Sequence, residues 1–349
     1  MTDLRNTLFY YATKELSQDA FICWLCSFSL EGSRADDREL VRCSCDLIRT
    51  FMTRGLEKNG DDASLQLISV EKQVGNIDIL LTVKFDNEIF KVIIEDKVNS
   101  HDHDNQLQRY RNDVEKEGYK VIGIYFITGF QSDLSRVYDA DYKVFDRKDM
   151  LKLLRECKSE NEILKDFRAY WENFEEIACS YKSGSLDEWA DWQAVNGFYD
   201  EMQVILTDTG LWSGYGYVPN AGGGFWGLWY GIKEDVVEKE TARAALYLQV
   251  ETAWDDGASR YNYKICLKFE NRSERDNDEI GSLKDLVLNT QGECGFERPA
   301  RMRSGSTMTI GVLSGVDESP TYEEFKKIIM SSSDRYKELL DRLKALINN

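Results

Sequence analysis

The segment KVIIEDKVNSHDHDNQLQRY, residues 91–110, joins an apolar run to a cluster of charges. Residues 92–94 are apolar and β-branched, a composition typical of a buried strand. Glu95, Asp96 and Lys97 follow at once, so this strand carries acids and a base to the edge of the core. Because charged groups near a core are costly unless they are paired, we expect this strand end to have a function.

A tight turn before this strand determines which residues lie opposite its charges. Asp86, Asn87 and Glu88 suit a turn, and the segments around it have strand composition over 65–75, 77–85 and 89–98. A two-residue turn at Asp86 and Asn87 places Asp78 opposite Glu95. A turn shifted by one residue places Asp78 opposite Lys97 instead.

Both registers gather the same three side chains, because side chains alternate between the two faces of a strand. Asp78, Glu95 and Lys97 share one face, whereas Asp96 points to the other. Two carboxylates among apolar neighbours repel each other unless they share a cation, and Mg²⁺ prefers such oxygen ligands. The alternative is a surface ladder of ion pairs across a hairpin, which would contribute to stability alone.

This combination suits metal-assisted hydrolysis. A divalent ion polarises a phosphoryl oxygen and lowers the pKa of a bound water. Lys97 is placed to orient that water, to take its proton or to counter the developing charge.

A helix predicted over 103–117 adds two polar side chains near the same strand end. Asp102 or Asp104 can cap the start of this helix. Gln106 and Tyr110 are four residues apart and therefore share one helix face. We expect both to reach back to the site and to bind phosphate or water.

The first half of the chain follows the order helix, three strands, helix, strand. Apolar residues at helical spacing predict helices over 13–30 and 40–56. Residues 120–130 form a nearly continuous apolar run, typical of a central strand buried on both faces. A helix predicted over 150–178 closes this half.

Asp78 in one strand, Glu95-x-Lys97 in the next and Gln106-x-x-x-Tyr110 in the following helix resemble the motifs of the PD-(D/E)xK nuclease superfamily. The αβββαβ order resembles the restriction-endonuclease-like core of that superfamily, an α/β fold with a mixed sheet. The leader ATKELSQDAFICWL is similar to the start of a bacterial branch of these proteins.

The resemblance implies phosphodiester hydrolysis that depends on Mg²⁺, with Mn²⁺ as an alternative. It implies that Asp78 and Glu95 bind the metal ion, together with Glu15 from the first helix and the carbonyl of Asp96. It assigns activation of the water to Lys97. Gln106 joins the catalytic set, and Gln106 and Tyr110 bind the substrate.

The length of 349 residues predicts two domains. Residues 1–180 are expected to form the nuclease domain and residues 185–349 an α+β recognition or regulatory domain, because the polar segment 179–189 resembles a linker. The second half is predicted to contain a helix, four aromatic-rich strands, a polar helix, two further strands and a terminal helix. The ranges for the first helix, the two further strands and the terminal helix are 187–207, 296–302, 306–313 and 320–347.

The expected function is a metal-dependent nuclease, most simply one acting on DNA, with anti-phage defence or DNA processing as its role by analogy. The sequence leaves RNA as a substrate open, and it does not decide between an endonuclease and an exonuclease. The alternative is a nucleic-acid- or effector-binding protein whose nuclease core is inactive or activated by a partner. The net charge of −18 keeps this alternative open, because it repels polyanions over the whole surface. A homodimer or a regulatory partner is compatible with both functions.

Several features predict a cytoplasmic protein. No apolar stretch is long enough to span a membrane, and the N-terminus carries charges where a secretory signal needs an apolar core. The eight cysteines are placed as reduced thiols would be. Cys23 and Cys26, with Cys43 and Cys45, could instead form a four-thiolate zinc site, but the first pair lies in an apolar helical pattern, which favours thiols.

Two other patterns also allow both a functional and a structural interpretation. His101 and His103 are favoured as part of a solvated loop over a metal site. The spacing of Arg38, Arg42, Arg49 and Arg54 favours solvated positions over a phosphate-binding stripe.

The aromatic residues of segments 212–217 and 225–230 could stack bases, but a role in the core of a sheet is favoured. Glycines alternate with these aromatics, as in FWGLWYG, and leave room for a flat group against a strand. In the next strand Leu246, Leu248 and Val250 alternate with polar residues, which predicts one buried face and one face suited to recognition. The polar residues are Tyr247, Gln249 and Glu251.

Overall fold

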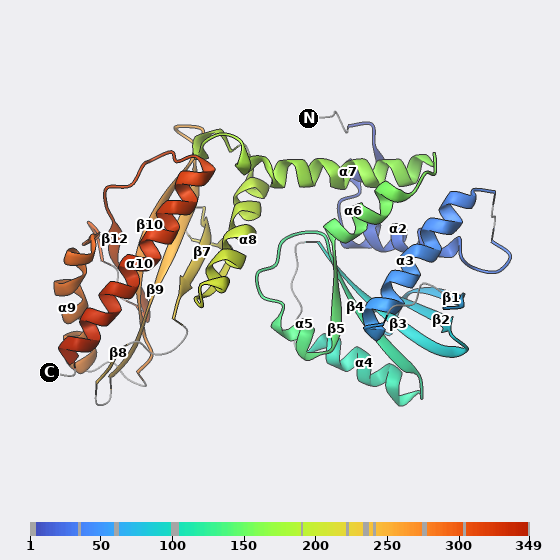
Figure 1. Cartoon of the computed structure of the whole chain (residues 1–349), viewed down its shortest axis with the longest axis horizontal. Coiled ribbons are helices and arrows are strands. Elements are labelled where there is room, and N and C mark those ends of the chain that lie inside the picture. Colours follow the sequence, from blue (N-terminus) through green and yellow to red (C-terminus); the bar gives the residue numbers. More distant parts are fainter. Residues whose placement is uncertain are drawn as a thin grey trace. The chain divides into compact units, whose positions relative to one another are not determined.

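The protein is seen in a computed structural model, which divides it into two compact units, Met1–Glu175 and Glu176–Asn349 (Figure 1). The residues described are 5–33, 36–58, 63–98, 105–189, 191–220, 223–232, 237–239, 242–273, 278–302 and 305–347. His101, His103 and the two predicted capping residues, Asp102 and Asp104, lie outside these ranges. Within them, no helix has both the length and the apolarity needed to cross a membrane.

A five-stranded sheet forms the centre of the first unit, in the order β1-β2-β3-β4-β5. The first three strands pair antiparallel, whereas β3, β4 and β5 pair in parallel. The strands are β1 (Leu65–Val74), β2 (Ile77–Phe85), β3 (Glu88–Lys97), β4 (Lys120–Ile127) and β5 (Tyr142–Asp146). The middle strand, β3, has fully buried apolar residues at positions 92–94, as its composition predicts.

Helices cover both faces of this sheet (Figure 1). Helices α2 (Glu15–Ser27) and α3 (Arg38–Leu56) pack on one face, and α4 (Gln106–Lys116) and α5 (Ser135–Asp139) on the other. The remaining helices are α1 (Leu8–Tyr11), α6 (Arg147–Glu156) and α7 (Glu162–Ala178). The predicted mixed α/β architecture and its αβββαβ order are therefore present.

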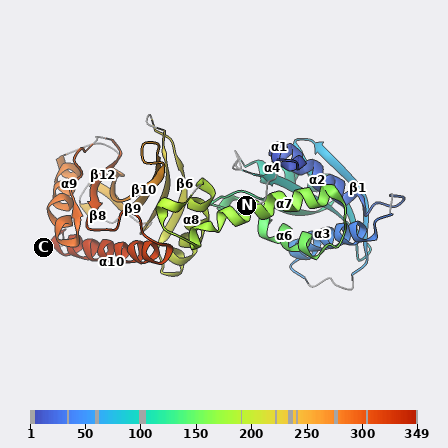
Figure 2. The same cartoon turned by 90° about the horizontal axis from the view of Figure 1, so that it is seen from above.

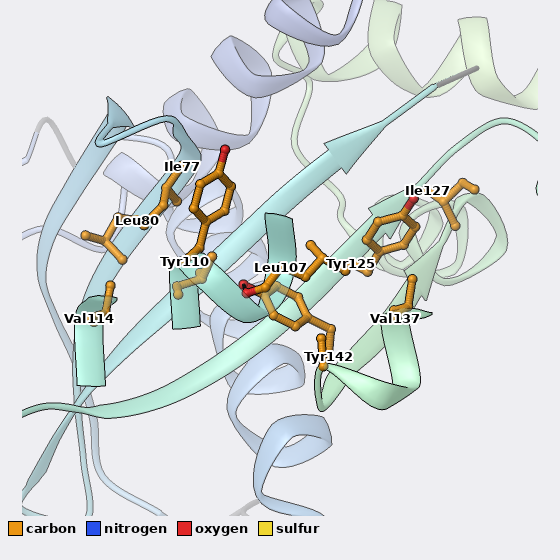
Figure 3. Packing of buried hydrophobic residues seen from close by; sticks show 11 residues of the cluster. Ile77, Leu80, Leu107, Tyr110, Val114, Tyr125, Ile127, Val137 and Tyr142 are labelled. Atoms are coloured by element: carbon orange, nitrogen blue, oxygen red, sulfur yellow. Dashed lines mark hydrogen bonds between the residues drawn. The ribbon is translucent and has the colours of Figure 1, made fainter. Parts of the chain in front are cut away.

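A cluster of buried apolar side chains holds α4 and α5 against the sheet (Figure 3). Leu107, Tyr110 and Val114 of α4 pack with Leu80 of β2 and Ile93 of β3. Since Ile93 faces α4, alternation along β3 turns Glu95 and Lys97 to this same face and Asp96 to the face of α2.

The turn between β2 and β3 fixes the register of the hairpin. Asp86 and Asn87 have left-handed backbones, with φ of 47° and 69°, as a two-residue hairpin turn requires. Phe85 therefore pairs with Glu88, and Ile79 with Ile94. Of the two registers considered above, this one brings Asp78 level with Glu95.

The segment 150–178 forms two helices, α6 and α7, so the prediction of one continuous helix was wrong. Asp146 caps the start of α6 through a capping box with Asp149. The chain is extended at Cys157, and the Asn161 side chain then accepts hydrogen bonds from Ile163 N and Leu164 N to start α7. The short elements α5 and β5 were not predicted.

The second unit contains a sheet in the order β11-β12-β10-β9-β7-β6, with β8 paired to β9. Its strands are β6 (Trp212–Val218), β7 (Phe225–Gly231), β8 (Val237–Lys239), β9 (Ala242–Asp255), β10 (Arg260–Asn271), β11 (Phe296–Glu297) and β12 (Thr307–Leu313). The predicted strand over 296–302 is only two residues long, and Pro299, which lacks a backbone N–H, follows it closely. The predicted linker contains two short 3₁₀ helices, η1 (Ser180–Lys182) and η2 (Leu186–Glu188).

Helices α8 (Trp192–Asp208) and α10 (Tyr322–Ile347) lie against one face of this second sheet, and α9 (Asp278–Thr290) packs beside α10 (Figures 1 and 2). The Tyr199 hydroxyl of α8 bonds to Thr252 Oγ1, and the Tyr336 hydroxyl of α10 donates to the carbonyl of Leu246. A third 3₁₀ helix, η3 (Gln291–Cys294), follows α9. Leu246, Leu248 and Val250 are fully buried on this face, as the alternation in β9 predicts.

Candidate active site

Glu95 is the centre of a polar cluster on the α4 face of the first sheet. Its side chain is fully buried, and its Oε1 accepts hydrogen bonds from Lys97 Nζ at 2.5 Å and from Gln106 Nε2 at 2.8 Å. Gln106 Nε2 also lies 2.9 Å from the Tyr110 hydroxyl. The end of β3 and the first turns of α4 therefore meet at one carboxylate, as the spacing in the sequence predicts.

Two further carboxylates hold the backbone at the same strand end. Asp78 Oδ2 accepts from the backbone N–H of Asp96 at 3.0 Å, and Glu15 Oε1 accepts from that of Val98 at 3.0 Å. Glu15 is the first residue of α2, so this helix contributes an acid to the site from the other side of the strand.

The charges of these groups influence one another. Burial raises the pKa of Asp78, and the nearby charge of Glu15 adds to this effect. Burial opposes protonation of Lys97, but the charges of Glu95, Asp78 and Glu15 outweigh it and raise the Lys97 pKa. Three acids thus surround one base, and this excess of negative charge would attract a cation.

Asp96 points away from this cluster, as the alternation predicts, and lies among buried polar side chains of α2. Gln18 Nε2 donates to Asp96 Oδ1, and the charges of Asp19 and Asp96 influence each other. Burial, with the charge of Asp78, raises the pKa of Asp19 to about 6, and burial next to Asp19 raises that of Asp96 well above its usual value. One atom of each carboxyl, Asp19 Oδ1 and Asp96 Oδ2, is buried without a hydrogen bond.

Residues that the sequence did not point to extend this group of buried polar side chains. Thr128 Oγ1 donates to Gln18 Oε1 at 3.1 Å, and Arg147 donates to the carbonyl of Thr128 and pairs with Glu175 at 2.8 Å. Asp19 is four residues after Glu15 on one helix, a spacing that could have identified it. Thr128 and Arg147 carry no such signal, because only the folded chain brings them to Gln18.

The donor set of the site fits a divalent metal ion. Glu15, Asp78 and Glu95 offer only oxygen ligands, and these acids exceed the charge of Lys97 by two. In the described part of the chain, however, no group of three or more His, Cys, Asp or Glu side chains is arranged to hold an ion, and the Lys97 ammonium pairs with Glu95 instead. By the same observation Cys23, Cys26, Cys43 and Cys45 are not arranged to hold an ion, and no disulfide joins any of the eight cysteines, all of which are described.

Arg54 is not in the solvated position that its spacing favoured. Its guanidinium donates to both carboxylate oxygens of Asp149, at 2.5 and 2.9 Å, and to the carbonyl of Val144 at 2.6 Å. This arginine therefore joins α3 to the start of α6.

Comparison with known proteins agrees with this geometry. No curated protein and no solved structure matches the chain significantly. The family model of the PD-(D/E)XK nuclease superfamily matches residues 6–181, about half of the chain, and this region contains the sheet and the whole polar cluster. Proteins of this superfamily are nucleases that typically use divalent metal ions. The chain therefore belongs to the PD-(D/E)XK nuclease superfamily.

Proposed function

We propose that the chain is a metal-dependent deoxyribonuclease that cleaves phosphodiester bonds at the cluster around Glu95. One observation carries this proposal. The side chains of Lys97 and Gln106 both bond the Glu95 carboxylate at the C-terminal end of β3, where Asp78 accepts a hydrogen bond from the Asp96 backbone. An ordinary ion-pair ladder across a hairpin would lie on the surface, whereas here Glu95 is fully buried and Lys97 is 7% exposed.

Each side chain has a distinct role in this proposal. Asp78, Glu95 and Glu15 would hold Mg²⁺, or Mn²⁺ in its place, together with the carbonyl of Asp96. The ion would polarise a phosphoryl oxygen and make a water easier to ionise. Lys97 would then orient that water and counter the charge that develops on the phosphate.

Gln106 and Tyr110 form the side of the site that comes from α4. The amide of Gln106 bonds both the Glu95 carboxylate and the Tyr110 hydroxyl, so it positions Glu95. We propose that both side chains also contact the substrate phosphate. An endonuclease acting on DNA in the cytoplasm, in defence or in DNA processing, is the role that the superfamily suggests by analogy.

The test is cleavage of labelled linear, circular and single-stranded DNA and of RNA, with Mg²⁺, Mn²⁺ or EDTA. Asp78→Ala and Lys97→Ala should each reduce cleavage by about a hundredfold or more, since they remove a metal ligand and the residue that acts on the water. Lys91→Ala is the matched control, because Lys91 lies on the same strand but bonds Thr82. Equal cleavage by the wild type and both variants would assign the activity to another site or to a contaminant.

A specific observation favours a second candidate function, a binding protein whose nuclease core is switched on by a partner. Lys97 Nζ lies 2.5 Å from Glu95 Oε1, where it competes with a metal ion for that carboxylate. In this case the purified chain would bind DNA in the presence of Mg²⁺ but leave it uncut, and the addition of an activating partner would restore cleavage.

A further inference from the structure

The face of the second sheet that α8 and α10 leave uncovered is hollowed into a cavity of about 990 Å³. Strands β7, β9, β10 and β12 form its floor, and Tyr247, Gln249 and Glu251, the predicted polar face of β9, lie in its centre. A second hollow of about 320 Å³ shares Trp229 and Tyr247 with it. Cavities of this size accommodate small molecules the size of a cofactor.

The indole ring of Trp229 lines one end of this cavity. A Cβ atom at Gly214 would overlap its indole, and Cβ atoms at Gly216 and Gly227 would lie 3.5 and 3.4 Å from its ring carbons. The three glycines therefore leave room for the indole to lie across β6 and β7. The room beside the glycines of FWGLWYG is taken by the side chain of Trp229. Because Trp229 lines the cavity, a planar ligand in the cavity can reach its ring.

Positive charge gathers at the other side of the cavity. Lys264 Nζ and Lys268 Nζ lie 2.7 and 2.8 Å from the two carboxylate oxygens of Glu251, and Lys268 Nζ also donates to Thr309 Oγ1 at 2.8 Å. Arg301 completes the basic side. Among the described lining residues, three bases thus face one acid, although the whole chain has a net charge of −18.

We propose that this cavity binds a nucleotide, with the base stacked on Trp229 and the phosphate held by Lys264, Lys268 and Arg301. The register supports this arrangement, because β7, β9 and β10 are adjacent and Trp229, Lys264 and Lys268 lie on the same face of these strands. Stacking on an aromatic ring combined with positive charge is the general chemistry of nucleotide recognition. The ligand is either a free nucleotide or a nucleotide of a single strand.

The site lies wholly within the second unit, and its occupancy does not require the proposed nuclease activity. Binding can therefore be measured in EDTA, where the proposed activity is absent. Calorimetric titration of the full chain with AMP, a short oligothymidylate and inorganic phosphate distinguishes the sources. Much tighter binding of the oligothymidylate indicates a strand, tighter binding of AMP indicates a free nucleotide, and phosphate alone should bind more weakly than the favoured ligand.

Three variants test the roles of the side chains. Trp229→Leu should weaken binding by about tenfold or more through loss of stacking. Arg301→Gln should weaken it by about threefold and reduce its dependence on salt. Ala253→Trp fills the cavity from its floor without touching the buried face of β9, and it should abolish binding.

Two matched controls accompany them. Trp254→Leu removes an exposed tryptophan that does not line the cavity, and Lys327→Gln removes an exposed base of α10. Circular dichroism checks that each variant is folded. The proposal is overturned if neither nucleotide binds, if folded Trp229→Leu and Trp254→Leu lose affinity equally, or if Ala253→Trp keeps full affinity. A dimer dissociated by Ala253→Trp, with no nucleotide bound, would assign this face to a second copy of the chain instead.

Discussion

Glu95 is fully buried, yet its carboxylate accepts hydrogen bonds from two side chains that belong to different elements. Lys97 comes from the same strand, and Gln106 comes from the first turn of α4. If Glu95 binds a metal ion, Gln106 is the side chain from α4 that, with Lys97, holds the Oε1 atom of Glu95 in place. Residues that orient a metal ligand affect activity without touching the metal themselves.

We expect Gln106→Ala to reduce the cleavage rate by about ten- to a hundredfold, because Glu95 and Tyr110 each lose a hydrogen-bond partner. The free energy of unfolding should fall by only about 1 kcal/mol, the usual cost of one hydrogen bond. The measurements are single-turnover cleavage and urea unfolding. Gln108→Ala is the control, since Gln108 bonds only the exposed Asn112 among the hydrogen bonds of the described residues. A rate equal to that of wild type would remove Gln106 from the site.

At this scale the sequence predicted the side chains that alternation and helical spacing can fix. Asp78, Glu95 and Lys97 follow from the pleat, and Gln106 and Tyr110 follow from the helical period. Asp19 was missed, although its spacing from Glu15 places both on one face of α2 and could have identified it. That spacing does not show that Asp19 is buried where its charge influences Asp96, which only the folded chain shows.

Among the elements, the β2–β3 hairpin was the most predictable, because two residues suited to positive φ leave few possible registers. The segment after β5 was harder. Both α6 and α7 have strong apolar periodicity, and only the Asn161 cap and the extended Cys157 separate them. A break of this kind depends on local hydrogen bonds, which apolar periodicity does not predict.

Arg54 joins α3 to α6 through the carboxylate of Asp149. Burial opposes ionisation of Asp149, but the hydrogen bonds from Arg54 and the backbone outweigh it and keep the Asp149 pKa below its ordinary value of 3.8. A carboxyl with a lowered pKa in the folded state stabilises the fold above its unfolded pKa. That contribution is lost as the pH falls through the folded-state value, which here lies below 3.8.

We therefore expect Arg54→Gln to lower the free energy of unfolding by about 1 kcal/mol near neutral pH, since about a third of each side chain is exposed and solvent weakens the pair. The difference from wild type should shrink as the pH falls below 3.8 and through the folded-state pKa of Asp149. Urea unfolding near neutral pH and in this acidic range measures it. Arg155→Gln, which removes a more exposed pair with Glu172, should change stability by less at either pH. A pH-independent difference would mean that Arg54 acts through packing alone.

In the whole molecule, the two halves of the chain contain separate sheets with separate cores. The length of the chain led us to expect two domains, but the function of the second could not be predicted from its aromatics. Tyr215 and Tyr230 are buried in the core, whereas Trp212 and Tyr217 are more than 40% exposed and Trp229 lies across glycines. Alternation places Trp212 and Trp229 on the face opposite Tyr215 and Tyr230, whereas Tyr217 shares the face of Tyr215 and is exposed near the end of β6. Only the folded sheet shows which face the helices cover.

We propose that the two units unfold as separate domains, each stabilised by its own ligand. Calorimetry of the full chain should show two transitions. AMP at about a hundred times its Kd should stabilise one unit by about 2.7 kcal/mol, which raises its transition by about 5–10 °C. Trp229→Leu should remove most of this shift and leave the other transition in place. Mg²⁺ should raise only the other transition, and Asp78→Ala should abolish that effect. A single transition that responds to both ligands would show that the units unfold together and would overturn the prediction.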